Sequence, residues 1–136
     1  MSTRTALLLS AGAAFFLGLT SAIAAPDLGQ RTSMSDGVSI AVKPLALGAG
    51  AKSWDFEVTL NTHTTPLEQD LTKVSVLVDP AGASHKPTGW KGDPPGGHHR
   101  KGVLQFSPLA GSPQYVELQI RDVGSPAVRS FKWQLR

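Results

Sequence analysis

The sequence predicts an all-β protein, an antiparallel β-sandwich of about seven strands. Three observations support this prediction. From residue 37 onwards, apolar residues recur at every second position, which is the period of strands that bury one face. Segments rich in glycine, proline and serine separate these stretches. No stretch beyond residue 37 keeps the period of 3.6 residues that an amphipathic helix needs.

The first 24 residues have the features of a secretory signal peptide. Arg4 precedes an apolar run from Ala6 to Leu19, and Ala22-Ile23-Ala24 has the small-x-small pattern that signal peptidase recognises. The run is shorter than the roughly 20 apolar residues that span a bilayer, so we expect cleavage and no lasting membrane anchor. Because the chain has no cysteine, lipid attachment, disulfides and thiolate chemistry are ruled out. The sequence therefore predicts an exported bacterial protein, periplasmic or secreted.

The charge on the remaining chain argues against nucleic-acid binding. Without the first 24 residues, 12 basic residues stand against 10 acidic ones, a net charge of about +2. The charges alternate in sign and do not cluster beyond Arg100-Lys101, which is typical of a solvated surface. Residues 25–36 are polar and aperiodic, and we expect a flexible lead-in there. A single domain over residues 37–136 follows.

Two strands are expected at the start of this domain. In the first, over residues 38–42, alternate residues are apolar, and Pro44 ends the strand. A glycine-containing turn over residues 45–51 follows. The second strand covers residues 53–60. Its inward positions are Trp54, Phe56, Val58 and Leu60.

A break at residues 61–66 interrupts the strand pattern. Residues 67–71 are expected to form one helical turn or an irregular crossover. The next strand covers residues 72–79, and turn residues end it at 80–82. Its inward positions are Val74, Val76 and Val78. Residues 84–86 are a candidate for one further short strand.

Three more strands complete the predicted fold. Residues 103–106 are short and apolar, and longer strands cover residues 114–122 and 128–135. The inward positions of the longer strands are Val116, Leu118, Ile120, Phe131, Trp133 and Leu135. Short strands separated by turns, without helices, are typical of an immunoglobulin-like sandwich. Trp54 is the expected core anchor, because there is no cysteine pair to link the sheets.

The stretch from residue 82 to residue 102 is the candidate functional segment. It is a predicted loop of 21 residues with six glycines and three prolines. Loops of that length are uncommon in compact domains unless they are functional or disordered. Three of the four histidines lie in it, His85, His98 and His99, and imidazole is the commonest metal ligand. The fourth, His63, follows another strand and is able to meet the pair at one end of the sandwich.

A transition-metal site is therefore the first functional hypothesis. Its predicted ligands are His63, His98 and His99, completed by Asp70, Asp93 or water. Copper(II), zinc or nickel would suit such a set. Copper(I) would not, because one methionine, Met34, remains after residue 24 and the chain has no thiol.

Strand geometry leaves an alternative to this metal site open. Adjacent residues of an extended chain point to opposite sides, so His98 and His99 share an ion only if Gly96-Gly97 bends the backbone. Otherwise the two histidines lie on a solvated loop. His85 is then expected to be exposed, and Asp70 to cap the crossover.

An interaction surface is the second hypothesis. Trp90, with Lys91, Arg100 and Lys101 around it, predicts a cationic rim that would contact a protein or envelope partner. Enzymatic chemistry has little support. The glycine-rich run at residues 92–97 lacks the Gly-Lys-Ser/Thr ending of a phosphate-binding loop, and no serine stands in a Gly-x-Ser-x-Gly elbow. We therefore predict an exported, non-enzymatic binding protein.

Several motifs resemble those of small exported bacterial proteins of unassigned function. The likeness covers residues 54–106, nearly half of the chain after residue 24. The motifs are Trp54-x-Phe56-x-Val58-x-Leu60-x-Thr62-His63, Asp70-Leu71, Asp79-x-x-Gly82 and Trp90-x-Gly92, followed by Gly97-His98-His99-Arg100-x-Gly102-x-Leu104-x-Phe106. That family has no known activity to transfer. The resemblance implies that the two histidine segments form one site, and it does not identify a ligand.

Overall fold

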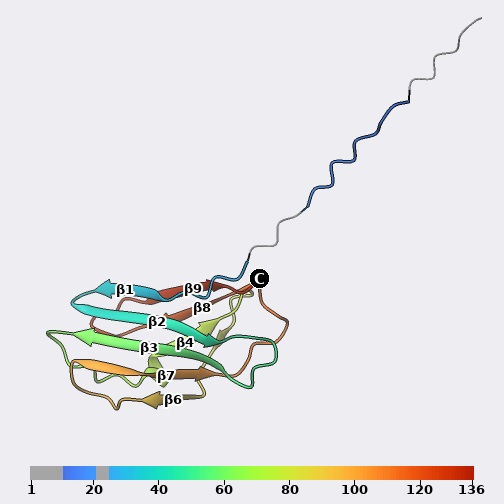
Figure 1. Ribbon diagram of the computed structural model, residues 1–136. Coiled ribbons are helices and arrows are strands. Elements are labelled where there is room, and N and C mark those ends of the chain that lie inside the picture. Colours follow the sequence, from blue (N-terminus) through green and yellow to red (C-terminus); the bar gives the residue numbers. More distant parts are fainter. Residues whose placement is uncertain (1–10, 21–24) are drawn as a thin grey trace, which may run out of the picture.

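The chain forms a sandwich of two antiparallel sheets in a computed structural model that describes residues 11–20 and 25–136 (Figure 1). The strands are β1 (Arg31–Ser35), β2 (Val38–Ala46), β3 (Trp54–Thr62), β4 (Ser75–Val78), β5 (Ser84–His85), β6 (Gly89–Gly92), β7 (His99–Phe106), β8 (Tyr115–Ile120) and β9 (Arg129–Gln134). One sheet has the order β1-β2-β3-β7-β6 and the other β5-β4-β8-β9. A helical turn, α1 (Leu71–Val74), precedes β4. The predicted all-β antiparallel sandwich is confirmed, with nine strands in the described residues in place of about seven.

The core lies between the sheets, where the alternating apolar residues of the strands meet. The inward positions predicted for β2, β3 and β8 are all buried: Val38, Ile40, Val42, Trp54, Phe56, Val58, Leu60, Val116, Leu118 and Ile120. Phe56 of β3 packs against Trp133 of β9, with ring centroids 5.4 Å apart, and edge-on against Phe106 of β7 at 5.7 Å. Because β9 belongs to the opposite sheet, the Phe56 and Trp133 pair is an aromatic contact across the sandwich.

The inward face of β4 is the reverse of the predicted one. Leu77 is fully buried and stands opposite Leu118 of β8, whereas Val76 and Val78 lie on the outer, partly exposed face. Val74 is in α1 rather than in the strand. The leucine takes the core position, while β-branched valines suit either face of a pleated sheet. Alternating valines therefore identified the strand and not its buried side.

Two segments predicted to be irregular are edge strands. The second half of the predicted flexible lead-in forms β1, which pairs with β2 from Arg31 opposite Val42 to Ser35 opposite Val38. The predicted loop over residues 82–102 contains β5, β6 and the first residues of β7. Edge strands are held by backbone hydrogen bonds and are commonly polar. A search for alternating apolar residues therefore misses them, and the length of residues 82–102 is no longer evidence for function.

The described N-terminal residues, 11–20, have no regular secondary structure and extend away from the sandwich (Figure 1). Their large apolar side chains, Phe15, Phe16, Leu17 and Leu19, are 86–98% exposed. The predicted signal peptide covers residues 1–24, and its cleavage motif at 22–24 lies outside the described residues. Within the described part of the chain, no helix has the length and apolar character needed to cross a bilayer.

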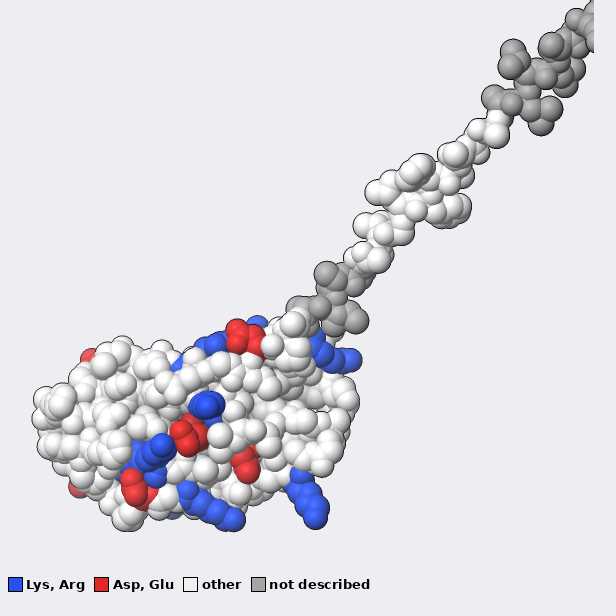
Figure 2. All heavy atoms as spheres, viewed as in Figure 1, with Lys and Arg blue, Asp and Glu red and all other residues white. Residues whose placement is uncertain are grey.

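Charged side chains of both signs are interspersed on the face of the sandwich shown in Figure 2. Lys101 of β7 and Glu57 of β3, which are neighbours on the outer face of the larger sheet, approach to 3.6 Å. This arrangement agrees with the solvated surface that the alternating charges of the sequence indicate.

A buried arginine ties the two sheets together at one end of the sandwich. Arg129 begins β9 and is 4% exposed. Its guanidinium donates hydrogen bonds to four carbonyl oxygens, those of Ser35 (2.8 Å), Val38 (3.0 Å), Val123 (3.0 Å) and Ser33 (3.4 Å). Three of these carbonyls belong to the β1–β2 hairpin of the opposite sheet. Arg129 therefore links the end of one sheet to the edge of the other.

Arg100 of β7 makes a comparable link at the same end. It is 1% exposed and donates to the carbonyl oxygens of Gln69 (2.7 Å), Leu67 (3.2 Å) and Asp93 (3.4 Å). Leu67 and Gln69 lie on the segment that leads from β3 to β4 in the opposite sheet. No carboxylate oxygen of the described residues lies within 4.0 Å of either buried guanidinium. Both charges are stabilised by backbone carbonyls instead.

Replacing Arg129 with methionine should lower the free energy of unfolding by about 2 to 4 kcal/mol. The substitution keeps an apolar stem and leaves the buried carbonyl oxygens of Val38 and Val123 without this donor. Urea denaturation followed by circular dichroism measures the change. The control is Arg121→Met, because Arg121 is exposed and approaches only Asp122, at 3.6 Å; it should change stability by less than about 0.5 kcal/mol. Equal effects of the two substitutions would contradict the linking role of Arg129.

Candidate functional site

The two histidine segments meet at the end of the sandwich that holds the buried arginines. β3 and β7 pair along their whole length, and the Thr62 N–H donates to the His98 carbonyl oxygen at 2.9 Å. The loops beyond them stay paired, since Leu67 donates to the Gly97 carbonyl oxygen (2.9 Å) and accepts from the Gly96 N–H (2.8 Å). The sequence therefore predicted correctly that these segments come together.

The imidazoles of these segments nevertheless do not form a common site. His99 faces outward, where its Nδ1 hydrogen-bonds to Oδ1 of Asn61, and the next residue, Arg100, points into the core. His98 and His63 are exposed. Across residues 11–20 and 25–136, no group of three or more His, Cys, Asp or Glu side chains is arranged to hold a metal ion. The predicted ligands of copper(II) or zinc are thus neighbours in the fold without being convergent.

The carboxylates proposed to complete the metal site have other partners. Asp70 is the N-cap of α1 and accepts hydrogen bonds from Thr72, through Oγ1 at 2.6 Å and the backbone N–H at 3.0 Å. These bonds to the ionised form hold the pKa of Asp70 below its ordinary value. Asp93 accepts from the Lys101 N–H at 2.9 Å. Capping, the alternative role for Asp70, is therefore confirmed.

The predicted cationic rim around Trp90 is largely an interior arrangement. Trp90 lies on β6, packs partly buried against the core, and donates from Nε1 to the Asp93 carbonyl oxygen at 2.9 Å. The Arg100 guanidinium lies 5.6 Å from the centroid of the Trp90 ring. Because Arg100 is buried, the prediction that it contacts a partner is wrong, and its guanidinium instead donates to backbone carbonyl oxygens within the fold. Lys101 remains exposed.

The fourth histidine, His85, is held by Asp79 across the β4–β5 turn, where exposure was expected. Nε2 of His85 lies 2.9 Å from Oδ2 of Asp79. Oδ1 of Asp79 accepts from the backbone N–H groups of Ala81 (2.9 Å) and Ala83 (3.0 Å). The hydrogen bond from His85, followed by those from the backbone, holds the pKa of Asp79 below its ordinary value. Both oxygens of this carboxylate therefore have hydrogen-bond partners within the hairpin.

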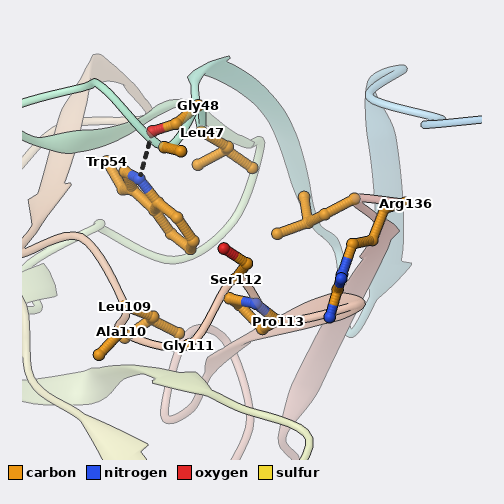
Figure 3. A pocket seen from close by; sticks show the side chains of 11 residues that line it. Leu47, Gly48, Trp54, Leu109, Ala110, Gly111, Ser112, Pro113 and Arg136 are labelled. Atoms are coloured by element: carbon orange, nitrogen blue, oxygen red, sulfur yellow. Dashed lines mark hydrogen bonds between the residues drawn. The ribbon is translucent and has the colours of Figure 1, made fainter.

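A pocket of about 420 Å³ opens at the opposite end of the sandwich (Figure 3). We call it the end pocket; it lies between the β2–β3 loop, the β7–β8 loop and the last residues of the chain. Its apolar lining includes Leu47, Trp54, Leu109 and Leu135, and its polar side chains are Ser112 and Arg136.

Trp54 forms the inner wall of the end pocket. It is 3% exposed, and its Nε1 donates to the Gly48 carbonyl oxygen at 3.3 Å (Figure 3). Because the polar atom of the indole already has a partner, the ring offers the pocket an apolar surface. Trp54 was predicted as a core anchor, and the structure places it where the core reaches the end of the sandwich.

The polar groups of the end pocket come from the β7–β8 loop and the last residue. Figure 3 shows the Ser112 hydroxyl directed into the pocket, between Trp54 and Arg136. Ser112 has a φ of 45°, a conformation that non-glycine residues adopt infrequently. A second pocket of about 330 Å³ adjoins the first and shares Ala110, Gly111, Pro113 and Arg136 with it. The loop at residues 110–113 thus separates two hollows.

Sequence reasoning missed the end pocket because its residues come from three separate segments. Those segments were assigned to turns or to strand ends, and none contains a motif with a known chemistry. One signal was present in the sequence. Leu47 and Leu109 are large apolar residues that lie within two positions of a glycine, in segments without strand alternation. Apolar residues in turns indicate either local packing or a lined cavity.

No family model, curated protein or solved structure matches this chain. The resemblance to small exported bacterial proteins stays a prediction.

Replacing Gly102 with alanine should loosen β6 and lower the free energy of unfolding by about 1 to 3 kcal/mol. A Cβ atom at this position would lie 2.6 Å from Cζ2 of Trp90 and 2.7 Å from the Lys91 carbonyl oxygen. Gly89→Ala is the matched control on the neighbouring strand, because the nearest atom to its Cβ would be Oε1 of Gln105 at 3.7 Å. Urea denaturation of both variants tests the contact. A stable Gly102→Ala variant would show that Trp90 does not lie against β7.

Replacing Asp79 with asparagine should destabilise the protein at neutral pH and have little effect in acid. The pKa of Asp79 is lowered in the folded state, so its carboxylate stabilises the fold above the ordinary pKa. That contribution is lost as the pH falls through the lowered value. Urea midpoints of both proteins, measured between about pH 7 and pH 3, should converge at the acid end. Glu68→Gln, at an exposed position, is the control. A difference that stays constant with pH would contradict the role of the charge.

Proposed function

We propose that this protein is a non-enzymatic binding protein that holds a small molecule with an apolar part in the end pocket. The observation that carries the proposal is the pocket itself, with a volume of about 420 Å³ and a buried tryptophan as its inner wall. Ligand sites typically occupy about 300 to 1,000 Å³ and combine apolar walls with a few polar groups. The end pocket has both properties.

The side chains of the end pocket support binding rather than catalysis. Arg136 is the one titratable side chain among the residues that line it. General acid–base catalysis needs a group that gains and loses a proton near neutral pH, and a guanidinium does not. A serine acts as a nucleophile when a base adjoins it, and no histidine or carboxylate side chain lines the pocket with Ser112. The lining is suited to holding a molecule unchanged.

The end pocket has more support than either function proposed from the sequence. His63, His98 and His99 lie at one end of the sandwich without converging on one point. Arg100 is buried beside Trp90, so the surface around Trp90 does not form the continuous cationic rim that the sequence predicted. Export is part of the proposal on the pattern of residues 1–24, so the ligand would be met in the periplasm or outside the cell.

The neutral fluorophore N-phenylnaphthylamine should bind the folded protein with a stoichiometry of one. Its aryl body matches the apolar lining, and binding should raise its fluorescence. Ala110→Trp, which fills the pocket from the β7–β8 loop, should weaken binding at least about tenfold. The matched control is Ala127→Trp in the β8–β9 loop at the opposite end of the sandwich, and it should bind like the parent protein.

Two results would contradict this proposal. One is the absence of saturable binding to a protein that circular dichroism shows to be folded. The other is an equal loss of affinity in Ala110→Trp and Ala127→Trp, because the fluorophore would then bind outside the end pocket. Amide chemical shifts of Trp54 and of residues 109–112 provide an independent location.

A further inference from the structure

The end pocket continues into the second hollow, which we call the adjoining pocket. The adjoining pocket has a volume of about 330 Å³ and shares the lining residues Ala110, Gly111, Pro113 and Arg136 with the end pocket. We infer that the ligand is an elongated amphiphile that occupies both hollows. Its apolar part would lie in the end pocket, and an uncharged, hydroxyl-bearing head group would lie in the adjoining pocket. The inference rests on the proposed function and adds the chemical class and the placement of the ligand.

The boundary between the two hollows carries no side chain at Gly111. This glycine lines both hollows and has a φ of 80°. A Cβ atom built on it would lie more than 4 Å from every heavy atom outside residues 110–112, and would therefore project into open space. A ligand that crosses the loop at this point meets only backbone, so one molecule is able to reach from the end pocket into the adjoining pocket.

The two hollows differ in the chemistry of their walls. The end pocket has four large apolar side chains, those of Leu47, Trp54, Leu109 and Leu135. None of these lines the adjoining pocket, whose apolar residues are only alanines, prolines and a glycine, and whose polar side chains are those of Asp79, Gln114 and Arg136. An alkyl or aryl body gains most free energy against the large apolar walls. A group that needs hydrogen bonds finds its partners in the adjoining pocket.

Charges of both signs line the adjoining pocket. The hydrogen bond from His85, followed by those from the backbone, lowers the pKa of Asp79, so this carboxylate is ionised at neutral pH. Arg136 contributes its guanidinium and, as the last residue of the sequence, a main-chain carboxylate. A head group of either charge would therefore lie close to a like charge. A hydroxyl both donates and accepts hydrogen bonds, so it suits the carboxylate, the guanidinium and the Gln114 amide alike.

A series of ligands with one alkyl chain and different head groups tests the inference. The series consists of 1-octanol, octyl glucoside, octyl sulfate and octyltrimethylammonium, titrated calorimetrically into the full chain below their micelle-forming concentrations. Octyl glucoside should bind about tenfold more tightly than 1-octanol, because its hydroxyls add hydrogen bonds in the adjoining pocket. Both charged ligands should bind more weakly than octyl glucoside.

Filling the adjoining pocket should remove the gain from the sugar. Ala81 is exposed and lines the adjoining pocket without lining the end pocket. Ala81→Trp should therefore abolish the tenfold gain of octyl glucoside and leave the affinity for 1-octanol unchanged. Ala83→Trp is the matched control, since Ala83 is exposed in the same β4–β5 turn and lines neither hollow. Both substitutions keep the backbone N–H that donates to Asp79.

A second variant removes a polar group without filling the adjoining pocket. Gln114→Leu keeps the approximate size of the side chain and replaces its amide with an apolar group. It should weaken octyl glucoside about threefold and leave 1-octanol unchanged. Gln105→Leu on β7 is the matched control, because Gln105 lines neither hollow. It should change neither affinity.

The outcomes separate this inference from the proposed function. Saturable binding of 1-octanol and octyl glucoside with equal affinity would overturn the head-group site and leave the end pocket standing. A gain that survives Ala81→Trp in a protein shown by circular dichroism to be folded, or that Ala83→Trp removes equally, would also overturn it. Tighter binding of either charged ligand than of octyl glucoside would overturn the uncharged head group. If 1-octanol does not bind the folded protein, the proposed function fails and the inference fails with it.

Discussion

The buried arginines at one end of the sandwich are the constraint on which the rest of the structure depends. Arg129 bonds carbonyl oxygens of the β1–β2 hairpin, and Arg100 bonds those of the segment that leads into α1. Each link runs from a strand of one sheet to chain that belongs to the other sheet or leads into it. Buried carbonyl and guanidinium groups need hydrogen-bond partners, because a buried polar group without a partner is costly. These hydrogen bonds link the two sheets at this end of the sandwich.

The sandwich has a closed end, which holds Arg100 and Arg129, and an open end, which holds the end pocket. The glycines, tryptophan and adjacent histidines of residues 82–102 predicted a functional site at the closed end. In the structure, residues of this stretch make contacts within the fold. Trp90 packs against the core, and the His99 side chain hydrogen-bonds to Asn61 of the neighbouring strand. At the open end, the β2–β3 loop, the β7–β8 loop and the last residues of the chain surround the end pocket next to Trp54.

The sequence predicted what depends on local alternation and missed what depends on long-range pairing. Strands with alternating apolar residues bury one face, and the sequence shows this alternation directly. The buried residues that it predicted include Val38, Ile40, Phe56, Leu118 and Trp133. β1 and β6 are held by backbone hydrogen bonds to β2 and β7. Backbone pairing does not require a pattern of apolar residues, so it cannot be recognised from the sequence. The end pocket depends on which loops share an end, and therefore on strand order. The meeting of the histidine segments was predictable because both lie at the ends of strands. The directions of their side chains were not predictable from the sequence.

The use of arginine as the tie between sheets has a consequence for where the domain can fold. A disulfide link forms only with an oxidant and is lost to a reductant, while a guanidinium keeps its charge across the whole range of biological pH. The carbonyl oxygens that it binds do not titrate either. A sandwich closed by Arg100 and Arg129 therefore folds to the same closed form in reducing and in oxidising surroundings, without an enzyme to make or reshuffle its crosslinks.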